Sequence, residues 1–165
     1  MISLRKILSQ AFVLPADVSM EFNQTCRRGE QLDCRLTIKS WESAIDVEKI
    51  SIALMAEESV EVDAGEQSGR ASEDDDSTVT IYVGTITSED ITVNEIITVS
   101  NAINLEPNRE YSWKTKFLVP KNSNPTYHGV HAHHKWWLSA TITLANRKLL
   151  SKKNFSYKWD GPIVS

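Results

Sequence analysis

The sequence predicts an all-β protein, an immunoglobulin-like antiparallel β-sandwich with a short N-terminal amphipathic helix. Apolar and polar residues alternate with a period of two in one segment after another, which is typical of strands with one buried and one solvent-facing side. No long helix is indicated between these segments, which argues against an alternating strand and helix fold. About eight such segments fit two packed sheets.

The predicted strand at 31–39 shows this alternation most clearly, because every second residue is apolar and the residues between are polar. Its inward-facing positions are Leu32, Cys34, Leu36 and Ile38. The other predicted strands are 18–22, 50–54, 79–83, 96–99, 111–119, 136–144 and 155–159.

Residues 1–16 are predicted to form the amphipathic helix and a turn. Apolar residues recur at helical spacing on one face, with polar and basic residues on the other. Polar residues interrupt the stretch and Pro15 leaves a poor cleavage site, so a removed signal peptide is disfavoured. The helix either docks on the domain's own core or touches a partner or a membrane surface through Leu4 and Leu8.

A single sandwich domain is expected over 17–160, with 161–165 as a tail. Within it, residues 61–77 are rich in carboxylates and poor in apolar side chains, and they carry most of the excess negative charge of the chain. Such a segment buries too little to offset the entropy lost on ordering, so a mobile acidic loop is predicted. Its spacing does not match a calcium-binding loop.

Charge and motifs exclude several classes of function. The net charge is -4 and no basic stripe is present, so a nucleic-acid partner is not expected. No apolar run approaches the roughly 20 residues of a membrane span. Nucleophile-elbow, phosphate-loop and zinc-protease motifs are missing from the sequence, so neither an enzyme nor a cofactor is predicted. A cytoplasmic location is expected.

Cys26 and Cys34 flank a turn that contains glycine. A disulfide across that turn is possible if the two strands face each other in register. Reduced thiols are the other interpretation, because two cysteines alone do not indicate an oxidising compartment.

Three stretches, in this order, carry a resemblance to a known family. They read LRKILSQAFVLPADVSMEF, then CRRGEQLDCRLTIKSWESAIDVEKISIALMAEE, then REYSWKTKFLVPKNSNPTYHG followed by KWWLSATITL. Together they resemble the arrestin-like fold, specifically its N-terminal-type domain as found in the bacterial sporulation-control arrestin-like family.

The resemblance implies fold-keeping roles rather than catalytic ones. It places Gly29 in a turn, Pro120 and Pro125 in a loop with Gly129 at its tip, and Trp137 in the strand that follows. Arrestin-like proteins are adaptors that recruit other proteins and share no active site. Family members usually carry two such sandwiches in tandem, whereas this chain has room for one, which would bind through a strand edge, through loops or as a homo-oligomer.

Four histidines cluster between the loop and the strand that bears the tryptophans: His128, His131, His133 and His134. The simpler interpretation is a set of solvent-exposed loop residues. The alternative is a transition-metal site, in a metal-binding protein or a metal-dependent enzyme, because imidazoles on one strand face make neighbouring ligands.

Neighbouring residues on a strand point to opposite faces, so only one of Trp136 and Trp137 is expected in the core. The other is either an exposed anchor for a partner or buried beneath the N-terminal helix. Together with Tyr127, these tryptophans are the predicted partner-binding residues. The leading hypothesis is therefore a non-enzymatic adaptor or scaffold for a partner protein.

Overall fold

The computed structural model describes residues 13–63, 67–70, 78–81, 85–145 and 153–165. Every regular element within these ranges is a β-strand, which confirms the prediction of an all-β fold. The strands are β1 (Ala16–Phe22), β2 (Thr25–Cys26), β3 (Gln31–Ser40), β4 (Ile45–Asp63), β5 (Gln67–Arg70), β6 (Thr78–Ile81), β7 (Thr85–Ser100), β8 (Ile103–Leu105), β9 (Glu110–Leu118), β10 (Tyr127–His128), β11 (Ala132–Leu144), β12 (Lys153–Asp160) and β13 (Ile163–Val164).

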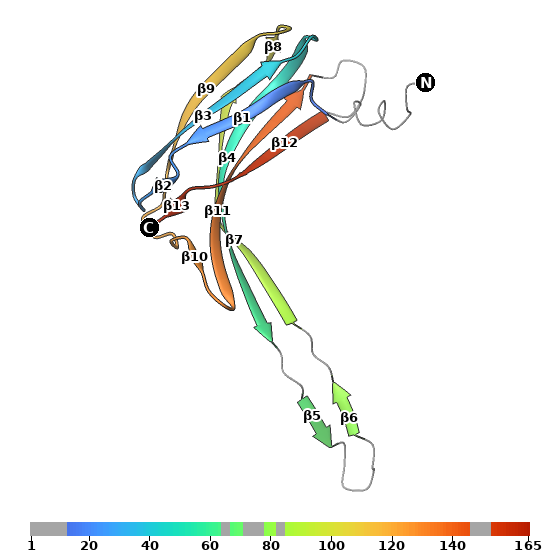
Figure 1. Ribbon diagram of the computed structural model, residues 1–165, viewed down its shortest axis with the longest axis vertical. Coiled ribbons are helices and arrows are strands. Elements are labelled where there is room, and N and C mark those ends of the chain that lie inside the picture. The colour runs from blue at the N-terminus through green and yellow to red at the C-terminus, as the bar shows by residue number, and fades with distance from the viewer. Residues whose placement is uncertain (1–12, 64–66, 71–77, 82–84, 146–152) are drawn as a thin grey trace.

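Two antiparallel sheets form the layers of the sandwich (Figure 1). One sheet has the strand order β1-β3-β9. The other has the order β10-β11-β4-β7, with β12 also paired to β11 and β8 also paired to β4. Two further pairs are separate, the parallel β13-β2 and the antiparallel β5-β6.

The core lies between the two sheets and follows the period-two pattern. All four inward positions predicted in 31–39 are buried on β3. Opposite them, Leu54 of β4 pairs with Leu138 of β11, and Ile52 pairs with Ala140. Each fully buried Leu, Ile or Phe contributes roughly 1.5–3 kcal/mol relative to an exposed side chain.

The hairpin of β4 and β7 extends well beyond the three-stranded sheet, as Figure 1 shows. Their pairing continues from Ile50↔Ser100 to Asp63↔Thr85. A register shift between Ala56 and Glu57 marks a β-bulge in this ladder. We call the part of this hairpin beyond Val60, where the pairing with β11 ends, the projecting hairpin.

The prediction of a loop throughout 61–77 is wrong for part of that segment. Residues 61–63 belong to β4, and Gln67–Arg70 forms β5. Pairing between strands supplies hydrogen bonds to the backbone N–H and C=O groups, so these strands form without an apolar face to bury. Likewise β7 begins at Thr85, long before the strand predicted at 96–99, and the remaining residues of the acidic segment lie outside the described ranges.

The sequence predicted a helix at the N-terminal end of the chain and a tail at the C-terminal end. The predicted N-terminal helix, with Leu4 and Leu8, falls within 1–12, outside the described residues. Residues 161–165 are more than a tail, because Ile163–Val164 forms β13 beside β2 and Val164 is buried. In the part of the chain that the structure describes, no helix has the length and hydropathy that a membrane span requires.

The two cysteines are free thiols, and both are buried. Cys34 faces the core from β3, and burial, with the charge of Asp33 as a smaller cause, raises the pKa of its thiol to about 12. A thiol with so high a pKa is a poor nucleophile at neutral pH. Of the two interpretations of this pair, the structure supports reduced thiols, because Cys26 and Cys34 are not joined by a disulfide.

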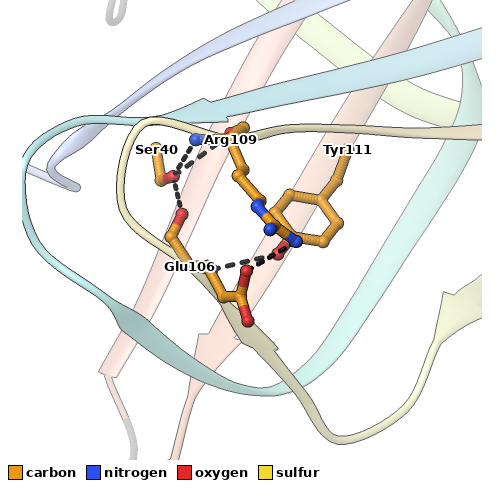
Figure 2. A network of polar contacts seen from close by, with 4 residues as sticks. All are labelled: Ser40, Glu106, Arg109 and Tyr111. Carbon is orange, nitrogen blue, oxygen red and sulfur yellow. Dashed lines mark hydrogen bonds and ion pairs between the residues drawn. The ribbon is translucent and has the colours of Figure 1, made fainter.

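A polar network closes the corner between β8 and β9 (Figure 2). The backbone N–H of Glu106 donates to the Tyr111 hydroxyl at 3.0 Å, and Arg109 forms an ion pair with Glu106 at 2.6 Å. Ser40, at the end of β3, donates to the Glu106 carbonyl and accepts from the Arg109 N–H at 3.2 Å. Asn108 adopts a positive φ of 57° in the same turn. The contact resembles the tyrosine corner of immunoglobulin-like sandwiches.

Replacing Tyr111 by Phe should lower the free energy of unfolding by about 0.5–1.5 kcal/mol, the usual net value of one hydrogen bond. Urea unfolding of both proteins measures the difference. The matched control is Tyr157→Phe, because the described residues provide no hydrogen-bond partner for the Tyr157 hydroxyl. An equal loss in both variants would show that the corner hydrogen bond adds nothing.

Candidate functional site

Three of the residues singled out from the sequence form one cluster. The short strand β10 pairs with the start of β11 so that Tyr127 lies opposite His134 and His128 opposite His133. The Tyr127 and His134 rings stack, with centroids 6.0 Å apart and an interplanar angle of 20°. The rings of His134 and Trp136 form a T-shaped contact, with centroids 5.7 Å apart and an interplanar angle of 79°.

His134 is completely buried, and both of its ring nitrogens are engaged. Nδ1 lies 3.1 Å from the carbonyl oxygen of Pro125, and Nε2 lies 2.7 Å from the Thr92 hydroxyl. A carbonyl can only accept, so Nδ1–H donates to Pro125 and neutral Nε2 accepts from Thr92. Burial lowers the pKa of His134, which favours this neutral form.

Glu58 completes the cluster from β4. It is the register partner of His134, and its carboxylate accepts a hydrogen bond from the Tyr127 hydroxyl. That hydrogen bond raises the pKa of the Tyr127 phenol. We call Glu58, Thr92, Tyr127, His134 and Trp136 the histidine cluster. Its members come from β4, β7, β10 and β11, so it ties four strands together.

The four histidines are not gathered into one metal site. His134 uses both nitrogens within the protein, and His128 and His131 are exposed. Across the described ranges, no three His, Cys, Asp or Glu side chains lie close enough together to hold a metal ion. Alternation places His133 and His134 on opposite faces of β11, which separates the two.

Of the two alternatives for the second tryptophan, the exposed anchor is wrong, because both tryptophans are buried; the other alternative involves residues 1–12, outside the described ranges. Trp136 is 4% exposed within the core, and Trp137 is 8% exposed on the other face of β11. Lys158 of β12 covers the Trp137 ring, with Nζ 3.9 Å from its centroid. This is a cation–π contact, in which the lysine also shields the ring from water. The indole N–H of Trp136 meets no acceptor among the described residues.

A cleft of about 340 Å³ lies beside these tryptophans. We call it the edge cleft; it is lined by Thr126, His128, residues 135–137, Lys158 and residues 160–163. It forms because β10 and β12 pair with different halves of the same edge of β11. Between the parts of β11 that pair with β10 and with β12, the Gly161 N–H donates to the Trp136 carbonyl oxygen at 2.8 Å.

Beside the edge cleft, β12 forms an outer strand of its sheet. Among the described strands it pairs only with β11. Its inward side chains, Phe155, Tyr157 and Trp159, pack against the core but stay partly exposed, and the last two stack with centroids 6.2 Å apart. An outer strand with partly exposed aromatic rings is a candidate contact surface.

A larger hollow of about 550 Å³ lies at one end of the three-stranded sheet. Four of its charged side chains pair off within the protein. Arg35 lies 3.8 Å from Glu21, and Lys116 lies 3.3 Å from Asp33. These four charges neutralise one another in pairs, and Lys114 is the fifth charged residue of the lining.

Comparison with known proteins bears on the fold. The structure is similar to that of Spo0M, a sporulation control protein from Bacillus subtilis, with a TM-score of 0.57 and 12% sequence identity over 92% of this chain. The chain has an arrestin-like fold. This confirms the resemblance seen in the sequence. The chain spans 50% of the length of Spo0M, so the likeness concerns the fold alone.

The other comparisons add no functional information. A β-glucosidase from Listeria innocua, in complex with glucose, matches at a TM-score of only 0.30 and 11% identity over 90% of this chain and 16% of that chain. No protein-family description matches the sequence, and no curated protein is similar to it in sequence.

Several residues of the site could not be found from local sequence patterns. Thr92 and Glu58 reach His134 from strands that are distant in sequence, so no spacing rule connects them. Lys158 looks like an ordinary polar position of an alternating strand. Gly161 had a signal, since Gly161-Pro162 directly after a strand marks a turn.

The histidine cluster should make stability fall in mild acid. Because the pKa of His134 is lowered in the folded protein, the unfolded chain binds the proton more readily below about pH 6.5, and stability decreases there as pH falls. Urea unfolding at about pH 7.5 and about pH 5.5 measures this loss. His134→Asn should reduce the pH dependence, and His131→Asn, a change at an exposed histidine, should keep it. The same pH dependence in all three proteins would contradict the assignment.

Replacing Gly161 by Ala should destabilise the protein by about 1–3 kcal/mol. The added Cβ would lie 2.6 Å from the carbonyl carbon and oxygen of Trp136, which are backbone atoms that cannot rotate away. Thermal unfolding measures the loss, and Asn154→Ala on the exposed face of β12 is the control. A variant as stable as the wild type would show that 160–163 can shift at no cost.

Proposed function

We propose that this protein is a non-enzymatic regulatory adaptor that binds a partner protein by strand addition at β12. An extended segment of the partner would lie beside β12 and extend the sheet, a common mode of peptide recognition. The single observation that carries the proposal is the row of backbone groups along the outer edge of β12.

The identity of those groups follows from the register. In an antiparallel ladder, alternate residues direct both their N–H and C=O groups to the same neighbour. Gly161 bonds to Trp136, so the pairs Trp159↔Leu138, Tyr157↔Ala140 and Phe155↔Ile142 are the hydrogen-bonded ones. The residues between them direct their backbone groups outward. They are Asn154, Ser156, Lys158 and Asp160.

The side chains of β12 suit an interface. Tyr157 and Trp159 are partly exposed beside the core, and both residue types are enriched at the centre of protein interfaces. The strand contains no proline, so every outward position keeps its N–H. A partner strand would therefore gain both backbone hydrogen bonds and contact with aromatic rings.

Of the other outer strands, β1 and β7 suit a partner less well. The exposed charged residues of β1, Asp17 and Glu21, are both acidic, whereas β12 carries charges of both signs. β7 carries Glu89 and Asp90, and its own Thr92 is the extra residue of the bulge opposite Ala56 and Glu57. Bulges and charges are the usual protection of a strand edge.

The fold comparison supports the regulatory part of the proposal. Spo0M is described as a sporulation control protein, and its similarity to this chain covers half of its own length. A control protein acts through its contacts with other molecules. We extend to this chain only that general role, without a named partner.

Ser156→Pro tests the proposal at a single backbone N–H. Proline removes an outward donor and no bond to β11, so the variant should stay folded yet lose its partner. Ser156→Ala, which keeps the N–H, is the matched control. Affinity capture from a lysate of the source organism, with mass spectrometry, should recover one partner with the wild type and Ser156→Ala but not with Ser156→Pro.

Two outcomes would count against the proposal. One is a partner that Ser156→Pro retains at wild-type levels, since binding would then use another surface. The other is self-association that Ser156→Pro abolishes, measured by sedimentation. That result would assign the edge of β12 to a second copy of this chain rather than to a partner.

A further inference from the structure

We propose that the edge cleft binds carboxylate side chains at the N-terminal end of the partner segment, and so selects acidic segments. The inference rests on the proposed function, because the edge of β12 must first hold that segment. It adds the chemistry of the partner, which strand addition alone leaves open.

The position of the edge cleft determines which end of the segment it meets. β12 runs from Lys153 toward Asp160, and the cleft is lined by Lys158 and residues 160–163 at its far end. A segment that pairs antiparallel to β12, the more stable geometry, runs in the opposite direction. Its N-terminal residues therefore arrive at the edge cleft.

The charges of the cleft favour an anion. Lys158 and Lys135 both line it, against the single carboxylate of Asp160. Lys135 lies 3.8 Å from Glu57, so part of its charge is already compensated. Lys158 has no carboxylate within 4.0 Å among the described residues, and its ammonium is held over Trp137 instead. This ammonium is the group to which a carboxylate would bind.

The walls of the cleft would hold the aliphatic part of an acidic side chain. Ile163, which is 61% exposed, supplies the open apolar surface, and the buried residues Trp137 and Pro162 also line the cleft. The volume of about 340 Å³ is at the lower end of the range for ligand pockets. The cleft thus combines an apolar wall with one well-placed cation, which suits Glu or Asp better than a neutral polar residue.

Three acetylated and amidated peptides test the inference by NMR titration of the intact chain: EETVTVTV, QQTVTVTV and TVTVTVEE. All three should shift the β12 amides. EETVTVTV should bind about two- to fivefold more tightly than QQTVTVTV, the range for a solvent-exposed ion pair. TVTVTVEE should resemble QQTVTVTV, because its carboxylates lie at the wrong end.

Two substitutions with opposite expected signs sharpen the test. Lys158→Gln should remove the advantage of EETVTVTV, whereas Asp160→Asn should increase it by taking away a repelling carboxylate. A purely structural role of either residue would affect all three peptides alike.

The possible failures are distinguishable. If no peptide shifts the β12 amides, strand addition is overturned, and this inference with it. If all three peptides shift them with equal affinity, or Lys158→Gln leaves the advantage of EETVTVTV intact, strand addition stands and the inference about the edge cleft is overturned. An advantage for TVTVTVEE would also overturn it, because the segment would then run parallel to β12.

Discussion

The antiparallel pairing of β4 with β11 is the constraint on which the rest of the structure depends. It runs from Val47↔Leu144 to Val60↔Ala132 and sets which residues of both strands face the core. A slip of β11 by one residue would turn Leu138 to solvent and bring Trp137 inside. This register also fixes the positions of the histidine cluster, the edge cleft and the outward backbone groups of β12, because each of them depends on residues of β11 or on pairing with it.

The sequence predicted the layers well, because burial on a strand has a simple period. Leu32 and Ile38 on β3 lie in the core as the alternation indicated. Which side chain covers a given residue follows no such period, because the covering side chain comes from another strand. Trp137 does point away from the core, yet Lys158 arrives from another strand and covers it. His134 was expected in a metal site or a solvent-exposed loop, but its partners come from β7 and the loop before β10.

The proposed adaptor activity depends on a division of roles within one sheet. In the proposal, the inner face supplies stability, and the outer edge of β12, which pairs with no other described strand, would supply the binding groups. Lys158 belongs to both parts, because its stem covers Trp137 while its ammonium lines the edge cleft.

The bulge at Ala56 and Glu57 has a consequence for the shape of the molecule. An extra residue in one strand increases local coiling and bends the ribbon. Here the bulge lies in the stretch of β4 that still pairs with β11, which ends at Val60, and the projecting hairpin extends away from the body in Figure 1. A bulge at this position therefore helps to set the direction in which the hairpin continues from the sheet.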